Sequence, residues 1–416
     1  MKFRLEPTPE QEQILREHCG QARLIWNLGL NQKNCYHPYI GPTPDFVEMS
    51  SQLTQLRKEI DWLKDGSQTV QQQALRDLDQ AFRNWWKNPG HFCRPTWRSR
   101  DRHEGFRIVG PQASRFERLS RKRARVFIPK VGWVDWRWSR DPGDVKSYRV
   151  KRDAAGRWWI AFAAKPEPKP NSENGKTVGV DCGIAHSFVT SEAEMIGVPG
   201  LTPGEQKRLL TLQRKLGRQE LGSNRRERTK REIARIVSRR VNRKKDVIEK
   251  LTTQLATSYE WIHIEDLKIR NMTRSAKGTL EEPGKNVAQK RGLNRSILEQ
   301  GWGLFAQRLE DKAPGRVKRI NPAYSSQCCS QCGRAAKENR KSQAGFLCVA
   351  CGYRDNADVN AAKVLSQGPG WATSPNGVEA NLAAGHAVSA RGESVVLGSV
   401  GSVGLDPGKR EPQLTC

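Results

Sequence analysis

Residues 329–362 read CSQCGRAAKENRKSQAGFLCVACGYRDNADVNAA, and they contain four cysteines in two closely spaced pairs. The pairs are Cys329-x-x-Cys332 and Cys348-x-x-Cys351, and fifteen residues separate them (348 − 332 − 1). A four-cysteine zinc ribbon has this spacing, because each pair occupies a tight turn from which two thiolates reach one tetrahedral ion. The spacing therefore predicts one structural Zn²⁺ bound by these four cysteines.

The same sequence leaves two alternatives to this ligand set. The pairs could form disulfides, but residues 1–6 (MKFRLE) contain no apolar export segment, and intracellular proteins seldom keep disulfides. Cys328 adjoins Cys329 and could replace it as a ligand. The two-residue gap to Cys332 favours Cys329, because zinc pairs have this spacing.

The chain is strongly basic, with 72 Lys and Arg against 44 Asp and Glu, a net charge of +28 and a pI near 10.0. Residues 207–250 alone hold seventeen basic and five acidic side chains. A charge run is usually a solvated helix face, but this excess favours a nucleic-acid partner. No apolar run approaches the length of a membrane span, so we expect no membrane partner.

Local patterns divide the first part of the chain into helical and strand-rich segments. Residues 1–8 contain a short strand, and Thr8-Pro9-Glu10-Gln11 is a helix-start signal. Helical periodicity then predicts a helical module over residues 9–100, in which residues 49–63 form a second helix and Ser67 caps a third. Residues 101–168 contain short β-branched or aromatic runs between turn residues, which is typical of a small barrel or sandwich.

The second part alternates buried strands with helices over residues 175–324. Within it, residues 203–258 are predicted to form basic helices, and the polar residues 270–292 a mobile loop. One helix is predicted over residues 293–306. The cysteine ribbon (325–354) and a short helical segment (355–365) follow. Residues 366–416 are rich in glycine and lack periodicity, which predicts a flexible tail.

Three acidic residues lie where buried segments should be apolar. Asp181 lies in an apolar strand, Glu265 ends another, and Asp358 opens the last helix. Carboxylates gathered in this way are stable if divalent cations lie between them, and a pair of Mg²⁺ ions, with Mn²⁺ as an alternative, can drive phosphodiester hydrolysis. The neighbouring Asp266 and Asp355 are expected to point elsewhere, because one step along a strand turns a side chain to the other face.

Four segments of the sequence resemble motifs of a known protein family. Residues 178–183 (VGVDCG), 264–267 (IEDL), 325–333 (SSQCCSQCG) and 358–362 (DVNAA) are similar to the split RuvC nuclease and zinc finger of TnpB. TnpB proteins are transposon-encoded RNA-guided DNA endonucleases, and type V CRISPR effectors descend from them. Four motifs in this order are specific, whereas any one of them would not be.

The resemblance implies a multidomain α+β protein. It would contain a helical recognition lobe (9–100), a wedge-like β-barrel (1–8 with 101–168) and an RNase H-like RuvC domain (175–324 with 355–365) carrying the inserted zinc ribbon. Asp181, Glu265 and Asp358 match the family's catalytic acids, which bind two Mg²⁺ ions. The four cysteines match its zinc ligands.

The implied partners are a guide RNA with a structured scaffold, double-stranded target DNA beside a short recognised motif, and the displaced single strand. Such a protein would act in the prokaryotic cytoplasm, at the nucleoid, and the sequence leaves open whether it is a monomer or a dimer. Ala357 stands where family members often have Arg, and Cys328 where they commonly have Thr. The presence of Ala357 in place of Arg is expected to affect the cleavage rate or the binding of the substrate phosphate.

The sequence also suggests alternative functions. A compact type V CRISPR effector would use the same chemistry, and a transposase would use similar acids for strand transfer. A nuclease-silent RNA- or DNA-binding regulator is disfavoured, because all three acids are retained. The sequence His263-x-Glu265 with Cys329-x-x-Cys332 also resembles the zinc deaminases, but that reading leaves Cys348 and Cys351 without a role.

Overall fold

The computed structural model describes residues 1–35, 43–100, 102, 104–164, 167–171 and 173–368. Its contacts divide the chain into two compact units. Of the described residues, unit 1 contains those within 1–164 and 207–237, and unit 2 contains those within 167–206 and 238–368. The predicted flexible tail lies outside the described residues from position 369 onward. Across the described part of the chain, no helix combines the length and apolarity needed to cross a bilayer.

The helices of the first 100 residues follow the predicted starts closely. Helix α1 (Pro9–Asn34) has the predicted capping box, in which the Thr8 side chain accepts from the Gln11 N–H while the Gln11 side chain accepts from the Thr8 N–H. Helix α4 (Gln68–Lys87) follows Ser67, although that side chain makes no capping hydrogen bond. The predicted second helix is two helices, α2 (Phe46–Glu59) and α3 (Asp61–Asp65), because Ile60 adopts an extended conformation between them.

Unit 1 also contains a curled, seven-stranded antiparallel sheet in the order β2-β6-β7-β1-β5-β4-β3. Strand β1 (Lys2–Glu6) pairs with β7 (Trp158–Phe162) on one side and β5 (Gly132–Arg137) on the other. The amino-terminal strand is therefore central to a sheet whose other strands come from residues 105–162. Those remaining strands are β2 (Gly105–Val109), β3 (Phe116–Arg118), β4 (Arg123–Ile128) and β6 (Ser147–Arg152).

Unit 2 is built on a mixed five-stranded sheet in the order β10-β9-β8-β11-β12. The three strands β8, β11 and β12 are parallel, and both β8 and β11 are buried along their centres. Their apolar residues form the core of this unit with helices α6, α8 and α9. The strands are β8 (Thr177–Asp181), β9 (Phe188–Thr190), β10 (Met195–Ile196), β11 (Trp261–Glu265) and β12 (Val317–Ile320).

The predicted basic helices are α5 (Pro203–Gly217) and α6 (Asn224–Ser258), and the unit boundary falls inside both. A single helix expected over residues 293–306 is wrong. The structure has α8 (Val287–Gln300) and α9 (Trp302–Lys312), because Gly301 adopts a left-handed conformation with φ of 83°. The range predicted to be a loop, 270–292, also overlaps the end of the short helix α7 (Ile269–Met272) and the start of α8.

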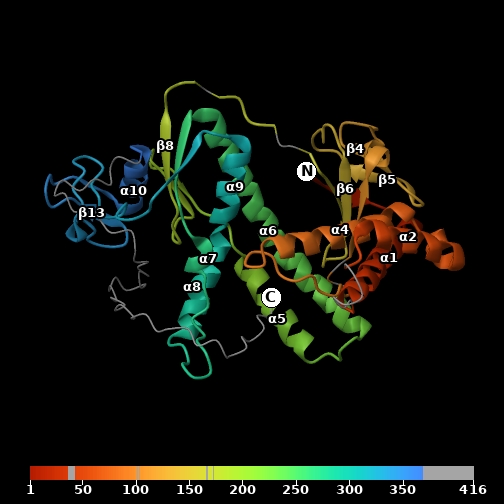
Figure 1. The fold of residues 1–416 in the computed structure, drawn as a ribbon. Coiled ribbons are helices and arrows are strands. Elements are labelled where there is room, and N and C mark those ends of the chain that lie inside the picture. Colours follow the sequence, from red (N-terminus) through yellow and green to blue (C-terminus); the bar gives the residue numbers. More distant parts are fainter. Residues whose placement is uncertain (36–42, 101, 103, 165–166, 172, 369–416) are drawn as a thin grey trace. The chain divides into compact units, whose positions relative to one another are not determined.

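Helix α10 (Ala357–Ser366) packs directly against strand β8 (Figure 1). The contact is between backbones, since a Cβ added to Gly179 of β8 would lie 2.0 Å from the Ala362 carbonyl oxygen and 2.6 Å from the Ser366 nitrogen. Only glycine permits this approach. The contact brings the start of α10 to the end of β8.

Replacement of this glycine should separate α10 from β8. We expect Gly179→Ala to lower the free energy of unfolding by about 1–3 kcal/mol, the usual cost of overpacking. Denaturant titration of the purified protein measures the change. Gly197→Ala is the matched control, because a Cβ at that position meets no atom within 4 Å. Equal stability of the two variants would contradict the backbone contact.

Candidate metal centres

Two of the three predicted acids end neighbouring parallel strands. The register between β8 and β11 pairs Ile264 with Val180, so the next residues, Glu265 and Asp181, lie side by side where these strands end. Ligand sites of parallel sheets form at this edge, where the side chains of adjacent strands project into the same space. Both carboxylates are half-buried.

The third acid reaches the same edge from helix α10. Asp358 is in the first turn of the helix, and the Asn356 side chain caps that turn by accepting from the Asp358 and Val359 N–H groups at 2.9 and 3.3 Å. A Cβ added to Gly183, just after β8, would lie 4.0 Å from Asp358 Oδ2. The structure therefore brings Asp358 to the end of the strand that carries Asp181.

The electrostatics show that these three carboxylates share one environment. Burial raises the pKa of Asp181 well above its usual value, and the charges of Glu265 and Asp358 raise it further. Burial, together with the Asp358 charge, raises the pKa of Glu265 to about 7 against the opposing effect of the Ser325 hydroxyl, which lies 3.3 Å from Glu265 Oε1. A divalent cation would relieve this repulsion.

The three carboxylates do not form a single compact ligand group of the kind that the cysteines form. Among the described residues, the four cysteines are the only metal-ligating group found in which every ligand atom lies within 4.8 Å of every other. Oxygen ligands of one Mg²⁺ lie about 2.1 Å from the ion, and a second ion about 4 Å away widens the set. Asp181, Glu265 and Asp358 are therefore the residues that could hold hard cations at this edge of the sheet.

The site contains one charged residue, an arginine, that the sequence did not predict. Arg340, from the segment between the two cysteine pairs, places Nη2 3.7 Å from Asp358 Oδ1. Its charge also acts on Asp181, where it opposes the rise in that pKa. The chain has Ala357 where an arginine was expected, and Arg340 brings a guanidinium to the same acid from a distant position. No local motif marks it, because Arg340 is one of several basic residues in this segment.

The two neighbouring acids lie outside this cluster, as predicted. Asp266 Oδ2 accepts from the Lys268 ammonium at 2.6 Å. Asp355 Oδ2 accepts from the Lys363 ammonium at 2.7 Å and from the Tyr353 hydroxyl at 2.6 Å. Each is already neutralised by a lysine, so neither needs a metal ion.

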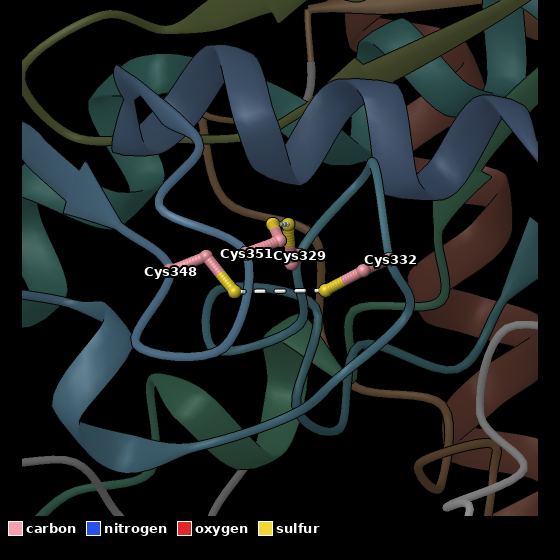
Figure 2. A group of neighbouring side chains, drawn as sticks. All are labelled: Cys329, Cys332, Cys348 and Cys351. Atoms are coloured by element: carbon pink, nitrogen blue, oxygen red, sulfur yellow. Dashed lines mark hydrogen bonds between the residues drawn. The ribbon is translucent and has the colours of Figure 1, made fainter.

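The four predicted zinc ligands converge on one point (Figure 2). The Cys329 and Cys351 sulfurs are 3.7 Å apart, and those of Cys332 and Cys348 are 3.6 Å apart. A tetrahedral site with Zn–S bonds of about 2.3 Å has edges of about 3.8 Å, whereas a disulfide would bring two sulfurs to about 2.05 Å. The residues fit a four-coordinate zinc ion, and the disulfide alternative is wrong for these pairs.

The two cysteine pairs have matching backbone hydrogen bonds. The N–H of Gly333 donates to the Cys329 carbonyl at 2.9 Å, and the N–H of Gly352 donates to the Cys348 carbonyl at 3.0 Å. Both glycines have positive φ, 72° and 73°, as the turns require. Each pair is thus a preformed knuckle that points two sulfurs at the same position.

The structure excludes two alternative ligands. The Cys328 thiol donates to the Gly333 carbonyl at 3.2 Å and is not part of the cluster. His263 is buried, and its Nδ1 lies 2.9 Å from the Leu365 carbonyl oxygen instead of facing the cysteines. The hypothesis of a zinc deaminase is therefore wrong, since the zinc site of those enzymes requires a histidine ligand.

The fold and these two centres define a class of protein. The molecule is a mixed α/β protein in which carboxylates at the ends of parallel strands adjoin a four-cysteine ribbon. A solved structure titled "Cryo-EM structure of the Cas12f1-sgRNA-target DNA complex" shares this fold. It matches 86% of this chain and 83% of the Cas12f1 chain, with a TM-score of 0.52 and 15% identity.

Family models and relatives identify the chain more closely. Models described as "Probable transposase" (OrfB_IS605), "Cas12f1-like, TNB domain" and "Helix-turn-helix domain" match residues 160–276, 302–365 and 1–37. The "Putative RNA-guided DNA endonuclease InsQ" of Escherichia coli (strain K12) is 37% identical, over 99% of this chain and 96% of InsQ. A "Putative RNA-guided DNA endonuclease" of Streptomyces pristinaespiralis is 28% identical over the same shares. The chain belongs to the TnpB (IS605 OrfB) family.

The adjacent cysteines 328 and 329 provide a direct test of the zinc site. We expect Cys329→Ser to lower zinc affinity by at least about tenfold, because it removes one of four thiolate ligands. Cys328→Ser is the matched control, a buried thiol one residue away that should retain full zinc content. Elemental analysis and chelator competition on purified protein measure both. Zinc loss in Cys328→Ser with retention in Cys329→Ser would reverse the ligand assignment.

Proposed function

We propose that this protein is an RNA-guided DNA endonuclease that hydrolyses phosphodiester bonds at Asp181, Glu265 and Asp358. The observation that carries the proposal is the convergence of these three half-buried carboxylates, where burial and then mutual repulsion raise the pKa values of Asp181 and Glu265. Repelling carboxylates at a nuclease-like sheet edge are suited to divalent cations and not to a purely structural role. The names of the full-length relatives support the same activity.

The carboxylates would hold two Mg²⁺ ions, or Mn²⁺ in their place. When bound, such ions activate water and stabilise the leaving 3′ oxygen in an in-line displacement. The protein's own side chains orient the reactants. Ser325 and the Asn356 cap hold Glu265 and Asp358 in place, and Arg340, close to Asp358, binds a nonbridging oxygen of the scissile phosphate.

The four cysteines hold one structural zinc ion and take no part in the chemistry. The zinc belongs to a closed site, because all four positions of a tetrahedral ion are filled by sulfur. We assign residues 325–354 to this ribbon and residues 175–324 with 355–365 to a RuvC domain. The parallel strands that carry Asp181 and Glu265 support the second assignment.

The RNA partner is supported by the outer face of the seven-stranded sheet. Residues paired across neighbouring strands share a face, and two such rows are Lys2–Ala161–Arg149 and Arg4–Trp159–Lys151. The Lys2 ammonium lies 4.2 Å from the centroid of the Trp159 ring. A basic face that also carries an aromatic ring suits phosphates and stacked bases.

We therefore assign this sheet, residues 1–8 with 101–168, to a wedge-like domain that binds the scaffold of a guide RNA, and residues 9–100 to a recognition lobe. Base pairing by the guide would select double-stranded DNA beside a short motif and displace one strand. The family model described as "Probable transposase", which matches residues 160–276, favours the transposon-associated form over a compact CRISPR effector. We expect the protein to act in the cytoplasm at the nucleoid, where its DNA substrate lies.

Loss of one carboxylate should separate cleavage from binding. We expect Asp181→Ala to slow Mg²⁺-dependent cleavage by the purified ribonucleoprotein by at least about 10³-fold, while RNA binding is retained. Asp266→Asn is the control, because that acid pairs with Lys268 outside the cluster, and it should cut as the wild type does. Gel assays of labelled DNA measure both rates. Unchanged cutting by Asp181→Ala would refute the catalytic assignment.

The RNA partner can be identified from the protein as expressed. Sequencing of co-purified nucleic acid should recover one discrete RNA with a structured part and a guide. Lys151→Glu, on the basic sheet face, should weaken its binding about tenfold and reduce the salt dependence. Lys58→Glu changes an exposed charge on α2 and serves as the control. Recovery of no discrete RNA would refute an RNA-guided function.

A further inference from the structure

Two fully buried asparagines connect the cysteine ribbon, one within the ribbon and one from the helix that carries Asp358. Asn339 and Asn360 are each 0% exposed. An amide side chain is seldom buried unless its donors and acceptor are satisfied, because an unpaired polar group in the interior costs free energy. The partners of these two amides show what the asparagines hold together.

Asn360 attaches the first cysteine knuckle to helix α10. Its Oδ1 accepts from the Ser330 N–H at 3.0 Å, and its Nδ2 donates to the Cys328 carbonyl at 2.7 Å. These two backbone groups flank the zinc ligand Cys329. The Gln367 side chain, past the other end of the helix, donates to the Ser330 carbonyl at 2.6 Å. Helix α10 thus holds the backbone on both sides of one zinc ligand.

Asn339 joins the two knuckles to each other and precedes Arg340. Its Nδ2 donates to the carbonyls of Gln327 and Arg334, at 2.8 and 3.1 Å, on either side of the first pair. Its Oδ1 accepts from the N–H of Val349, between the cysteines of the second pair, at 2.9 Å. The position of Arg340 therefore depends on both knuckles.

The second knuckle has its own connection to the carboxylates. Strand β13 (Gly345–Leu347) leads into Cys348, and strand β14 (Arg354–Asn356) returns from Cys351 and runs directly into α10. A metal ion bound by both knuckles would therefore link them into one continuous structure. This structure includes Arg340, from the segment between the two cysteine pairs, and the first turn of α10, which contains Asp358.

We propose that Asn339 and Asn360 are positioning residues that couple metal binding at the four cysteines to the carboxylate cluster, by holding Arg340 against Asp358. The proposal rests on the function proposed above. Helix α10 is independently held on β8 by the Gly179 backbone contact. Loss of the asparagine contacts should therefore release the ribbon and Arg340 and leave the sheet edge intact.

The coupling predicts three effects of Asn339→Ala or Asn360→Ala. Zinc should be lost to a chromogenic chelator at least about tenfold faster, as for other residues that orient metal ligands. Mn²⁺ should bind the carboxylates about twofold to fivefold more tightly, because a nearby positive charge has moved away. Single-turnover cleavage should nevertheless slow by about tenfold or more, with unchanged RNA affinity, because Arg340 no longer contacts the phosphate. The opposite signs of the last two effects separate positioning from unfolding, which would weaken all binding.

A double variant tests whether the asparagines act through Arg340. Asn360→Ala combined with Arg340→Ala should cut no more slowly than Arg340→Ala alone, since the arginine contact is already lost. Additive losses would overturn the proposal. Gln343→Ala, an exposed amide of the same segment, is the control and should match the wild type in zinc release, Mn²⁺ affinity and cleavage.

Removal of zinc from the folded wild-type protein provides the same test without a substitution. Chelated protein should bind Mn²⁺ more tightly and cut more slowly, and re-addition of Zn²⁺ should restore both values. Unchanged Mn²⁺ affinity and cleavage in the chelated protein would overturn the coupling. If the wild-type protein never cuts DNA, the proposed function fails, and zinc release and Mn²⁺ affinity still decide whether the two clusters are coupled.

Discussion

Three carboxylates cannot stay together at a half-buried sheet edge unless positive charge lies close by. Burial and mutual repulsion raise the pKa values of Asp181 and Glu265, so the unliganded edge is electrostatically unfavourable. The protein holds this arrangement with local structure: parallel strands for two acids, a capped helix for the third, and Arg340 beside Asp358. Repulsion between the acids favours the binding of divalent cations at this edge, and the surrounding contacts keep the acids from moving apart.

The cysteine ribbon is part of this arrangement and not an appendage. It lies in the sequence between the strands of the sheet and the helix that carries Asp358. Its first knuckle contacts that helix through Asn360, and its second knuckle continues into it through β14. A metal ion bound by the four cysteines would therefore organise the residues around the acids, and a closed four-thiolate site would take no part in the chemistry.

Local signals in the sequence predicted local features well. The Thr8–Gln11 capping box, the strand pattern before Asp181 and the two cysteine knuckles appear in the structure as expected, because each depends on residues a few positions apart. The prediction failed at Gly301, where one expected helix is two. A glycine inside a helical pattern can continue the helix or end it, and here packing of the flanking helices against the sheet of unit 2 decided the outcome.

The sequence by itself determined which residues could bind metal ions: cysteine pairs with zinc spacing, and acids where apolar residues were expected. These properties follow from residue type and short spacing, so they need no knowledge of distant contacts. Only the tertiary structure decided which charged groups lie close enough to interact electrostatically. It brings Arg340 to Asp358, excludes Asp266 and Asp355 by pairing them with lysines, and buries two asparagines that bond to the backbone of the cysteine ribbon. Coulomb interactions depend on distance in space, and residues far apart in the chain become neighbours only when it folds.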